Sequence, residues 1–227
     1  MQQINTQNIT APVVASDAPL AERLAFLRKV YGLLSISIFL AAGASWMTIN
    51  NENFLNLVFR NMMLFFIVEI AAIFFALWAR KKENLGYIAL FTFTILTGIT
   101  TAPILTIYTG ETVTNAAVLT GLVFAGLSLY TVSSKRDFSF MGGMLTTGLI
   151  VLIVGGLLNA FVFKSSMGSF MFSAGGVIIF SGFIIYDTFN ILHRYPTDEY
   201  ISATLSLYLD VLNLFLMLLR LLGGNRD

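Results

Sequence analysis

Three acidic residues, Glu69, Asp187 and Asp210, lie inside long apolar stretches of the sequence, whereas most other charged residues lie between such stretches. A carboxyl group at membrane depth costs about 3 kcal/mol on insertion scales, so its presence requires a partner or a purpose. Such a group can hold a proton, bind a cation or tie two helices together by a hydrogen bond. The last role is purely structural, and the residue types leave it open for all three acids.

Asp187 and Asp210 are placed almost symmetrically about Asp198, which lies in a short polar turn with Pro196. We expect the apolar stretches on either side of this turn to form antiparallel neighbouring helices. At about 1.5 Å per residue, both carboxyl groups should then lie level, roughly 10–15 Å from the turn. If the two helix faces meet, the carboxyl groups touch.

Two touching carboxyl groups at low dielectric cannot both ionise freely, so they share a proton and titrate as a coupled pair with one step raised. Such a pair is suited to sensing pH near neutrality. Fully ionised, it offers hard oxygen ligands to a cation. Because Ca²⁺ takes about 6–8 oxygen ligands, two carboxylates predict a weak, water-completed calcium site. Weak binding suits conduction, since the ion must be able to leave.

Polar side chains accompany the pair at helical spacing. Ser206 lies four residues before Asp210 and Asn213 three residues after it, while Asn190 follows Asp187 by three residues. Residues three or four apart share a helix face. A polar stripe on a lipid-embedded helix must face protein or water, so these residues are expected to support the acidic pair.

Arg80 ends the apolar stretch that contains Glu69. Its guanidinium group can reach inward to Asp187 or Asp210, or it can extend along the helix to the lipid headgroups. The residue pattern leaves both possibilities open.

The elements that position these residues are apolar segments of membrane-spanning length. The chain has 227 residues, of which 57% are hydrophobic and 11% charged, whereas soluble domains carry about 25% charged residues. A bilayer core of about 30 Å needs about 20 apolar residues per helix. Seven such stretches occur: 30–49, 55–79, 86–108, 112–133, 138–163, 170–192 and 201–222. We therefore predict an all-α integral membrane protein with a seven-helix transmembrane domain over residues 21–227, after a disordered polar tail at residues 1–20.

The distribution of charge predicts the orientation and excludes several kinds of partner. Nine Lys and Arg residues fall on the side of the N-terminus and four on the other side, which favours a cytoplasmic N-terminus. The net charge of +1 leaves no basic surface for nucleic acid. With no cysteine and one histidine, neither a Cys-based metal site nor a His-rich metal or haem site is expected.

Residues 206–215 (SLYLDVLNLF), together with the Leu-Leu-Arg at 218–220, resemble the signature of the Bax inhibitor family, also called the transmembrane Bax inhibitor motif family. Shorter matches occur at three further places: residues 186–188 (YDT), 98–103 (GITTAP) and 136–140 (RDFSF). The likeness extends over about residues 20 to 224 and keeps the order of all seven apolar segments.

This resemblance implies a helix bundle with the last helix at its centre. It also implies a calcium leak that pH controls through an aspartate pair, which maps onto Asp187 and Asp210. The family's second-helix arginine, which latches onto the sixth-helix aspartate, maps onto Arg80, and its second-helix glutamate maps onto Glu69. The cysteine-free chain and short loops suggest a bacterial member in the inner (plasma) membrane.

We therefore expect a passive, pH-sensitive calcium leak channel without a cofactor, whose partners are the lipid bilayer, calcium ions and protons. Some bacterial relatives are linked instead to restraint of a membrane-bound ATP-dependent protease. The alternative is thus an interaction protein that modulates such a protease or a stress response, and a third hypothesis is a proton-coupled transporter. We expect no enzyme activity, because intramembrane Ser–His chemistry needs a buried histidine and the Gly-x-Gly-Asp signature of aspartyl intramembrane proteases is absent.

Overall fold

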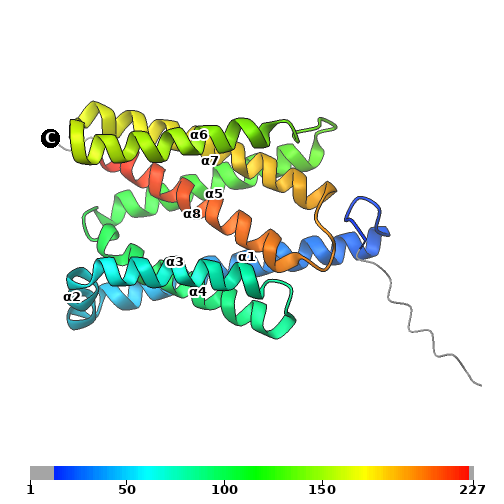
Figure 1. Cartoon of the computed structure of the whole chain (residues 1–227), viewed down its shortest axis with the longest axis horizontal. Coiled ribbons are helices and arrows are strands. Elements are labelled where there is room, and N and C mark those ends of the chain that lie inside the picture. The colour runs from blue at the N-terminus through cyan, green and yellow to red at the C-terminus, as the bar shows by residue number, and fades with distance from the viewer. Residues whose placement is uncertain (1–12, 225–227) are drawn as a thin grey trace, which may run out of the picture.

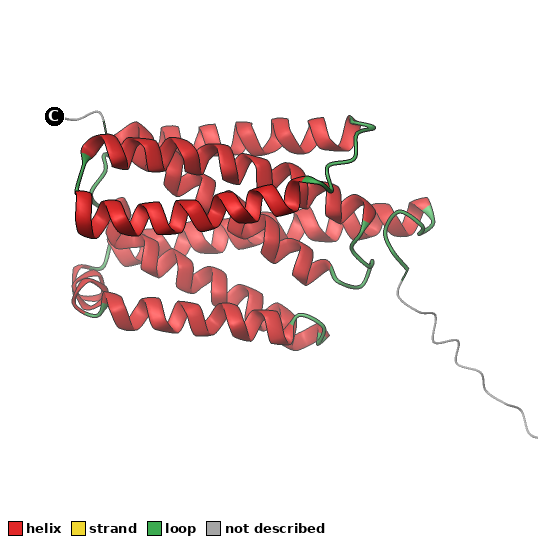
Figure 2. Ribbon diagram, turned by 45° about the horizontal axis from the view of Figure 1, so that its top comes forward, coloured by secondary structure: helices red, strands yellow, loops and turns green. Residues whose placement is uncertain are grey.

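The structure is a computed structural model that describes residues 13–224, and these residues form a bundle of α-helices with one π-helical turn (Figures 1 and 2). The elements, in chain order, are α1 (Leu20–Ile49), α2 (Glu52–Arg60), α3 (Met62–Ala79), α4 (Glu83–Leu105), α5 (Gly110–Ser133), α6 (Met141–Leu158), η1 (Asn159–Phe163), α7 (Ser166–His193) and α8 (Tyr200–Gly223). Seven helices within the described part are long and apolar enough to cross a membrane. The prediction of an all-α, seven-span membrane bundle is confirmed.

The second predicted span, residues 55–79, is wrong in its first part. The chain breaks at Asn61, whose backbone (φ −118°, ψ 28°) leaves the helix. The side-chain amide of Asn61 donates to the Leu57 carbonyl oxygen at 2.8 Å and closes the end of α2. A new cap at Asn51, which accepts the Phe54 backbone N–H at 3.0 Å, starts α2. The membrane span is therefore α3 alone, and α2 is a separate short helix at one end of the bundle (Figure 1).

Helix α8 runs through the middle of the bundle. In Figure 1 it runs between α6 and α7 on one side and α1, α3 and α4 on the other and crosses α5, and it packs against α1, α4, α5 and α7. Of its 24 residues, 14 are buried. The expectation that the last helix is central is confirmed.

The core follows from this central position. The first half of α8 contributes Leu205 and Leu207 to a cluster with residues of α1, α3 and α4, and its second half contributes Leu214 and Leu218 to a cluster with α5 and α7. The outward faces of the helices are also apolar, for example at Phe39, which is 77% exposed. A soluble protein rarely leaves large apolar areas uncovered, so these faces suit contact with lipid.

Residues 13–19 differ from the disordered tail that we predicted for residues 1–20. They lie on the turn between α7 and α8, where the Ala15 N–H donates to the Tyr195 carbonyl oxygen at 2.9 Å and the Thr197 N–H donates to the Val13 carbonyl oxygen at 3.1 Å. Ala15 is fully buried. Backbone hydrogen bonds order this segment, which the composition alone does not reveal. The rest of the predicted tail, residues 1–12, lies outside the described residues.

Candidate functional site

The hairpin of α7 and α8 brings Asp187 and Asp210 together. The two helices pack along each other, and the carboxyl group of Asp187 lies within hydrogen-bonding reach of the Asp210 carboxyl group and of the Asn190 side chain. Asp210 is buried, with 6% of its surface exposed, and Asp187 is half-buried. The structure therefore has the side-by-side arrangement that the spacing about the turn predicts.

The pair is under-satisfied in hydrogen bonds. Oδ2 of Asp210 and Oδ1 of Asn190 are buried and have no hydrogen-bond partner among the described residues. Two ionised carboxylates are both acceptors, so a hydrogen bond between them requires a proton on one of them. Buried acceptor oxygens of this kind are rare in folded proteins and call for an explanation. A shared proton or a bound cation would satisfy them.

No third acidic or histidine side chain joins the pair to make a metal site within residues 13–224. The protein ligands that a cation meets here are the two carboxyl groups and the Asn190 amide oxygen. A calcium ion at this place needs several water molecules to complete its shell of about 6–8 oxygens. With so few protein ligands, a cation bound at this place would be held weakly.

Arg80 does not form the predicted ion pair with Asp187 in this structure. Helix α3, which Arg80 ends, packs mainly against α4. Among the described residues, the ion pair joins instead the next residue, Lys81, to Glu199 at 2.9 Å. The Arg80 latch therefore has no direct contact here to support it.

Tyr195 lies near both the Asp187 carboxyl group and the Arg80 guanidinium group. Its hydroxyl group interacts with the Ser206 Oγ at 3.2 Å and is close enough to Asp187 and Arg80 to feel the charge of each. Burial raises the pKa of the Tyr195 hydroxyl group above its usual value. Sequence reasoning missed this residue, although its position in the turn that joins the two acidic helices pointed to it.

The residues that we expected to support the pair differ in what their side chains contact. Asn190 contacts the pair and Ser206 contacts Tyr195. Asn213 donates its amide N–H to the Leu209 carbonyl oxygen of its own helix at 2.8 Å. Among the described residues, the side-chain hydrogen bonds of Ser206 and Asn213 thus lead to Tyr195 and Leu209 and not to either aspartate.

Glu69 belongs to a second polar cluster. Its carboxylate accepts the Thr100 hydroxyl group at 2.6 Å, Thr100 also donates to the Thr97 carbonyl oxygen, and the Thr97 hydroxyl group bonds to the buried hydroxyl group of Tyr208. These residues link α3, α4 and α8. The recurrence of threonine along residues 94–101 was the signal for this cluster, which the sequence reasoning did not use.

Fold and site together define a polytopic α-helical membrane protein with an acidic pair in its last helical hairpin. Residues 23–227 match the family model described as inhibitor of apoptosis-promoting Bax1. The chain is 36% identical over 203 residues to protein lifeguard 4 of Mus musculus (88% of this chain, 85% of the relative). It is 34% identical over 226 residues to Bax inhibitor 1 of Schizosaccharomyces pombe (96% and 85%). It is 38% identical over 210 residues to an uncharacterized membrane protein of Vibrio cholerae (88% and 91%).

The chain therefore belongs to the Bax inhibitor family. The resemblance that residues 206–215 suggested is confirmed.

Proposed function

We propose that this protein is a passive calcium leak channel of the plasma membrane, with a cytoplasmic N-terminus, and that protonation of the Asp187–Asp210 pair controls its opening. The observation that carries the proposal is the pair itself, two adjacent carboxyl groups on the α7–α8 hairpin, one of them with a buried oxygen that has no hydrogen-bond partner within residues 13–224. Ionisable residues within membrane spans almost always face the interior of the bundle, where they mark ion pathways and proton relays.

The proposed gating follows from the chemistry of the pair. With one proton shared, the two carboxyl groups attract each other and hold α7 against α8. With both ionised, they repel and require water or a cation between them, which favours a more open, hydrated packing. One proton difference between the two states changes the open-to-closed ratio by at most about tenfold per pH unit, or about 1.4 kcal/mol. The leak should therefore rise gradually with pH rather than switch abruptly.

Calcium flux into proteoliposomes across pH 6 to 8 tests this proposal. Asp210→Asn keeps the side-chain volume but removes the coupling between the carboxyl groups, so it should flatten the pH profile. Glu69→Gln is the matched control, because it makes the same chemical change at the other intramembrane cluster and should keep the wild-type profile. If Asp210→Asn retains the full pH dependence, the pair is a structural contact and does not gate.

A second candidate is an interaction protein that modulates a membrane-bound ATP-dependent protease or a stress response. A relative's name supports a role in a stress response: the Golgi anti-apoptotic protein of vaccinia virus (strain Lister), 37% identical over 203 residues, is named for an effect on apoptosis. In this case the aspartate pair only ties α7 to α8. Normal restraint of the protease or stress response by an Asp210→Asn variant whose calcium leak has lost its pH dependence would favour this alternative.

A further inference from the structure

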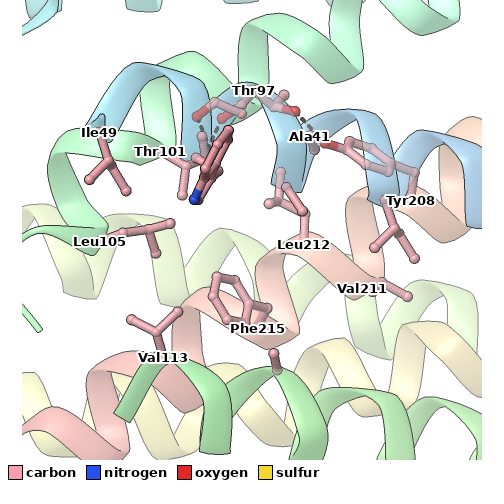
Figure 3. A pocket seen from close by; sticks show the side chains of 16 residues that line it. Ala41, Ile49, Thr97, Thr101, Leu105, Val113, Tyr208, Val211, Leu212 and Phe215 are labelled. Atoms are coloured by element: carbon pink, nitrogen blue, oxygen red, sulfur yellow. Dashed lines mark hydrogen bonds between the residues drawn. The ribbon is translucent and has the colours of Figure 1, made fainter. Parts of the chain in front are cut away.

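A cavity of about 370 Å³ lies between α1, α4, α5 and α8, apart from the aspartate pair. Its walls, seen in Figure 3, are almost entirely apolar and include Ala41 of α1, Val113 of α5, and Val211 and Phe215 of α8. This volume falls within the range of about 300–1,000 Å³ that is usual for ligand sites. It is also more than twice that of an engineered apolar cavity of about 150 Å³ that accepts benzene.

The hydroxyl groups on the wall are already used by the protein. Ser45 donates to the Gly98 carbonyl oxygen at 2.7 Å, Thr97 bonds to Tyr208, and Thr101 donates to the Thr97 carbonyl oxygen. A polar ligand would therefore find few groups to replace its lost hydration, and water would gain little by entering. The wall is suited to hydrocarbon.

The cavity opens toward the surface that faces the membrane. In the part of the chain that the structure describes, α1 and α5 meet at Tyr31 and Phe124, whose ring centroids lie 6.2 Å apart, but they are not extensively packed against each other, although both pack against α8. Residues that line the cavity from these two helices are exposed, as at Trp46, which is 68% exposed, and at Ala117. Because both helices are membrane spans, lipid hydrocarbon surrounds this opening. Acyl chains are as apolar as leucine side chains, so they match the apolar wall.

We propose that this cavity binds an acyl chain of a bilayer phospholipid, which enters between α1 and α5 and ends against α8. The described residues that line it carry no cation, so nothing inside holds the carboxylate of a free fatty acid. A phospholipid satisfies the site better, because its headgroup stays at the membrane surface while one chain fills the cavity. The chain would contact Tyr208 and Val211, on either side of Asp210, and would support the central helix. The proposal does not depend on calcium conduction.

Photochemical cross-linking in liposomes tests the proposal. The probe is a phosphatidylcholine with a diazirine near the end of one acyl chain, and adducts are mapped by mass spectrometry. Tyr208 and Val211 are 2% and 9% exposed, so a chain that only passes over the outer surface cannot label them. We expect adducts on these α8 residues. Labelling confined to outer positions such as Phe39 would overturn the proposal.

Two neighbouring substitutions in α5 provide a matched pair. Ala117→Phe places a ring in the cavity and should lower α8 labelling several-fold, whereas Val118→Phe, at a 57% exposed position outside the cavity, should leave it unchanged. Adducts on Val151 of α6, which is 65% exposed, report that each variant is inserted in lipid, and an unchanged Tm in detergent reports that it is folded. Equal α8 labelling in both variants, or its loss on adding excess free fatty acid, would contradict the proposed phospholipid site.

Discussion

Gly98 offers a sharp test of how α1 and α4 pack. A Cβ atom added at Gly98 would lie 2.9 Å from both the Ala41 Cα and the Ala44 Cβ, and still closer to the Ala41 carbonyl oxygen. Backbone atoms cannot rotate away as a side chain can, so Gly98→Ala must push the two helices apart. Overpacking of this kind costs about 1–3 kcal/mol. The displacement also weakens the bond from Ser45 to the Gly98 carbonyl oxygen, and such bonds are worth about 0.6 kcal/mol in membranes.

Alanine is a better helix former than glycine by about 1 kcal/mol, which offsets part of this cost. We therefore expect a net destabilisation of about 0.6–2.6 kcal/mol. For a chain of this length each 1 kcal/mol shifts Tm by about 2–4 °C, so Gly98→Ala should lower Tm by about 1–10 °C in detergent, measured by tryptophan fluorescence. Gly121→Ala is the control, because nothing lies within 4 Å of its added Cβ, and its Tm should stay the same or rise. A Tm for Gly98→Ala equal to or above that of the control would refute the close helix crossing.

Three further predictions concern other parts of the molecule. Tyr208→Phe removes the hydroxyl group that bonds to Thr97 and should destabilise the protein by about 0.5–1.5 kcal/mol in thermal unfolding; an unchanged Tm would mean that this bond contributes nothing. Tyr195→Phe should shift the pH midpoint of calcium leak more than Arg80→Ala does, because the Tyr195 hydroxyl group lies near Asp187, whereas Arg80 forms no ion pair with Asp187 among the described residues; the opposite order would restore the arginine latch. The pKa of the Asp137 carboxyl group is lowered chiefly by the backbone N–H of Ser139. The contribution of Asp137 to folding stability is therefore present above the unfolded pKa of about 3.9 and is lost as the pH falls through the folded pKa. Asp137→Asn should accordingly reduce the dependence of Tm on pH in the acid range, which a Tm series below pH 5 measures.

The features that could be predicted from the sequence are those that local patterns encode. Uninterrupted apolar stretches give the seven spans, since each must bury its backbone within lipid. The positions of Asp187 and Asp210 about a short turn give the pair, because antiparallel helices of similar pitch bring equidistant residues level. The central place of α8 came from family resemblance, although the polar stripe on that helix agrees with it.

The features that escaped prediction depend on single residues or on contacts distant in sequence. Asn61 breaks a stretch whose average hydropathy still resembles one helix. The pairing of residues 13–15 with the turn at residues 195–197 uses backbone groups, which leave no trace in side-chain patterns. Whether Arg80 can contact Asp187 depends on which helix α3 packs against. Sequence spacing does not reveal that packing partner.

The central claim is that Asp187 and Asp210 act as one titrating unit that controls calcium leak. A double-mutant cycle tests it most directly, with calcium flux measured in proteoliposomes between pH 6 and 8 for Asp187→Asn, Asp210→Asn and the double variant. Residues that act as a unit are strongly non-additive. Either single substitution should therefore remove the pH dependence, and the double variant should show no further loss. If each single variant keeps part of the pH dependence and the two losses add, the carboxyl groups titrate independently and the proposed gate is wrong.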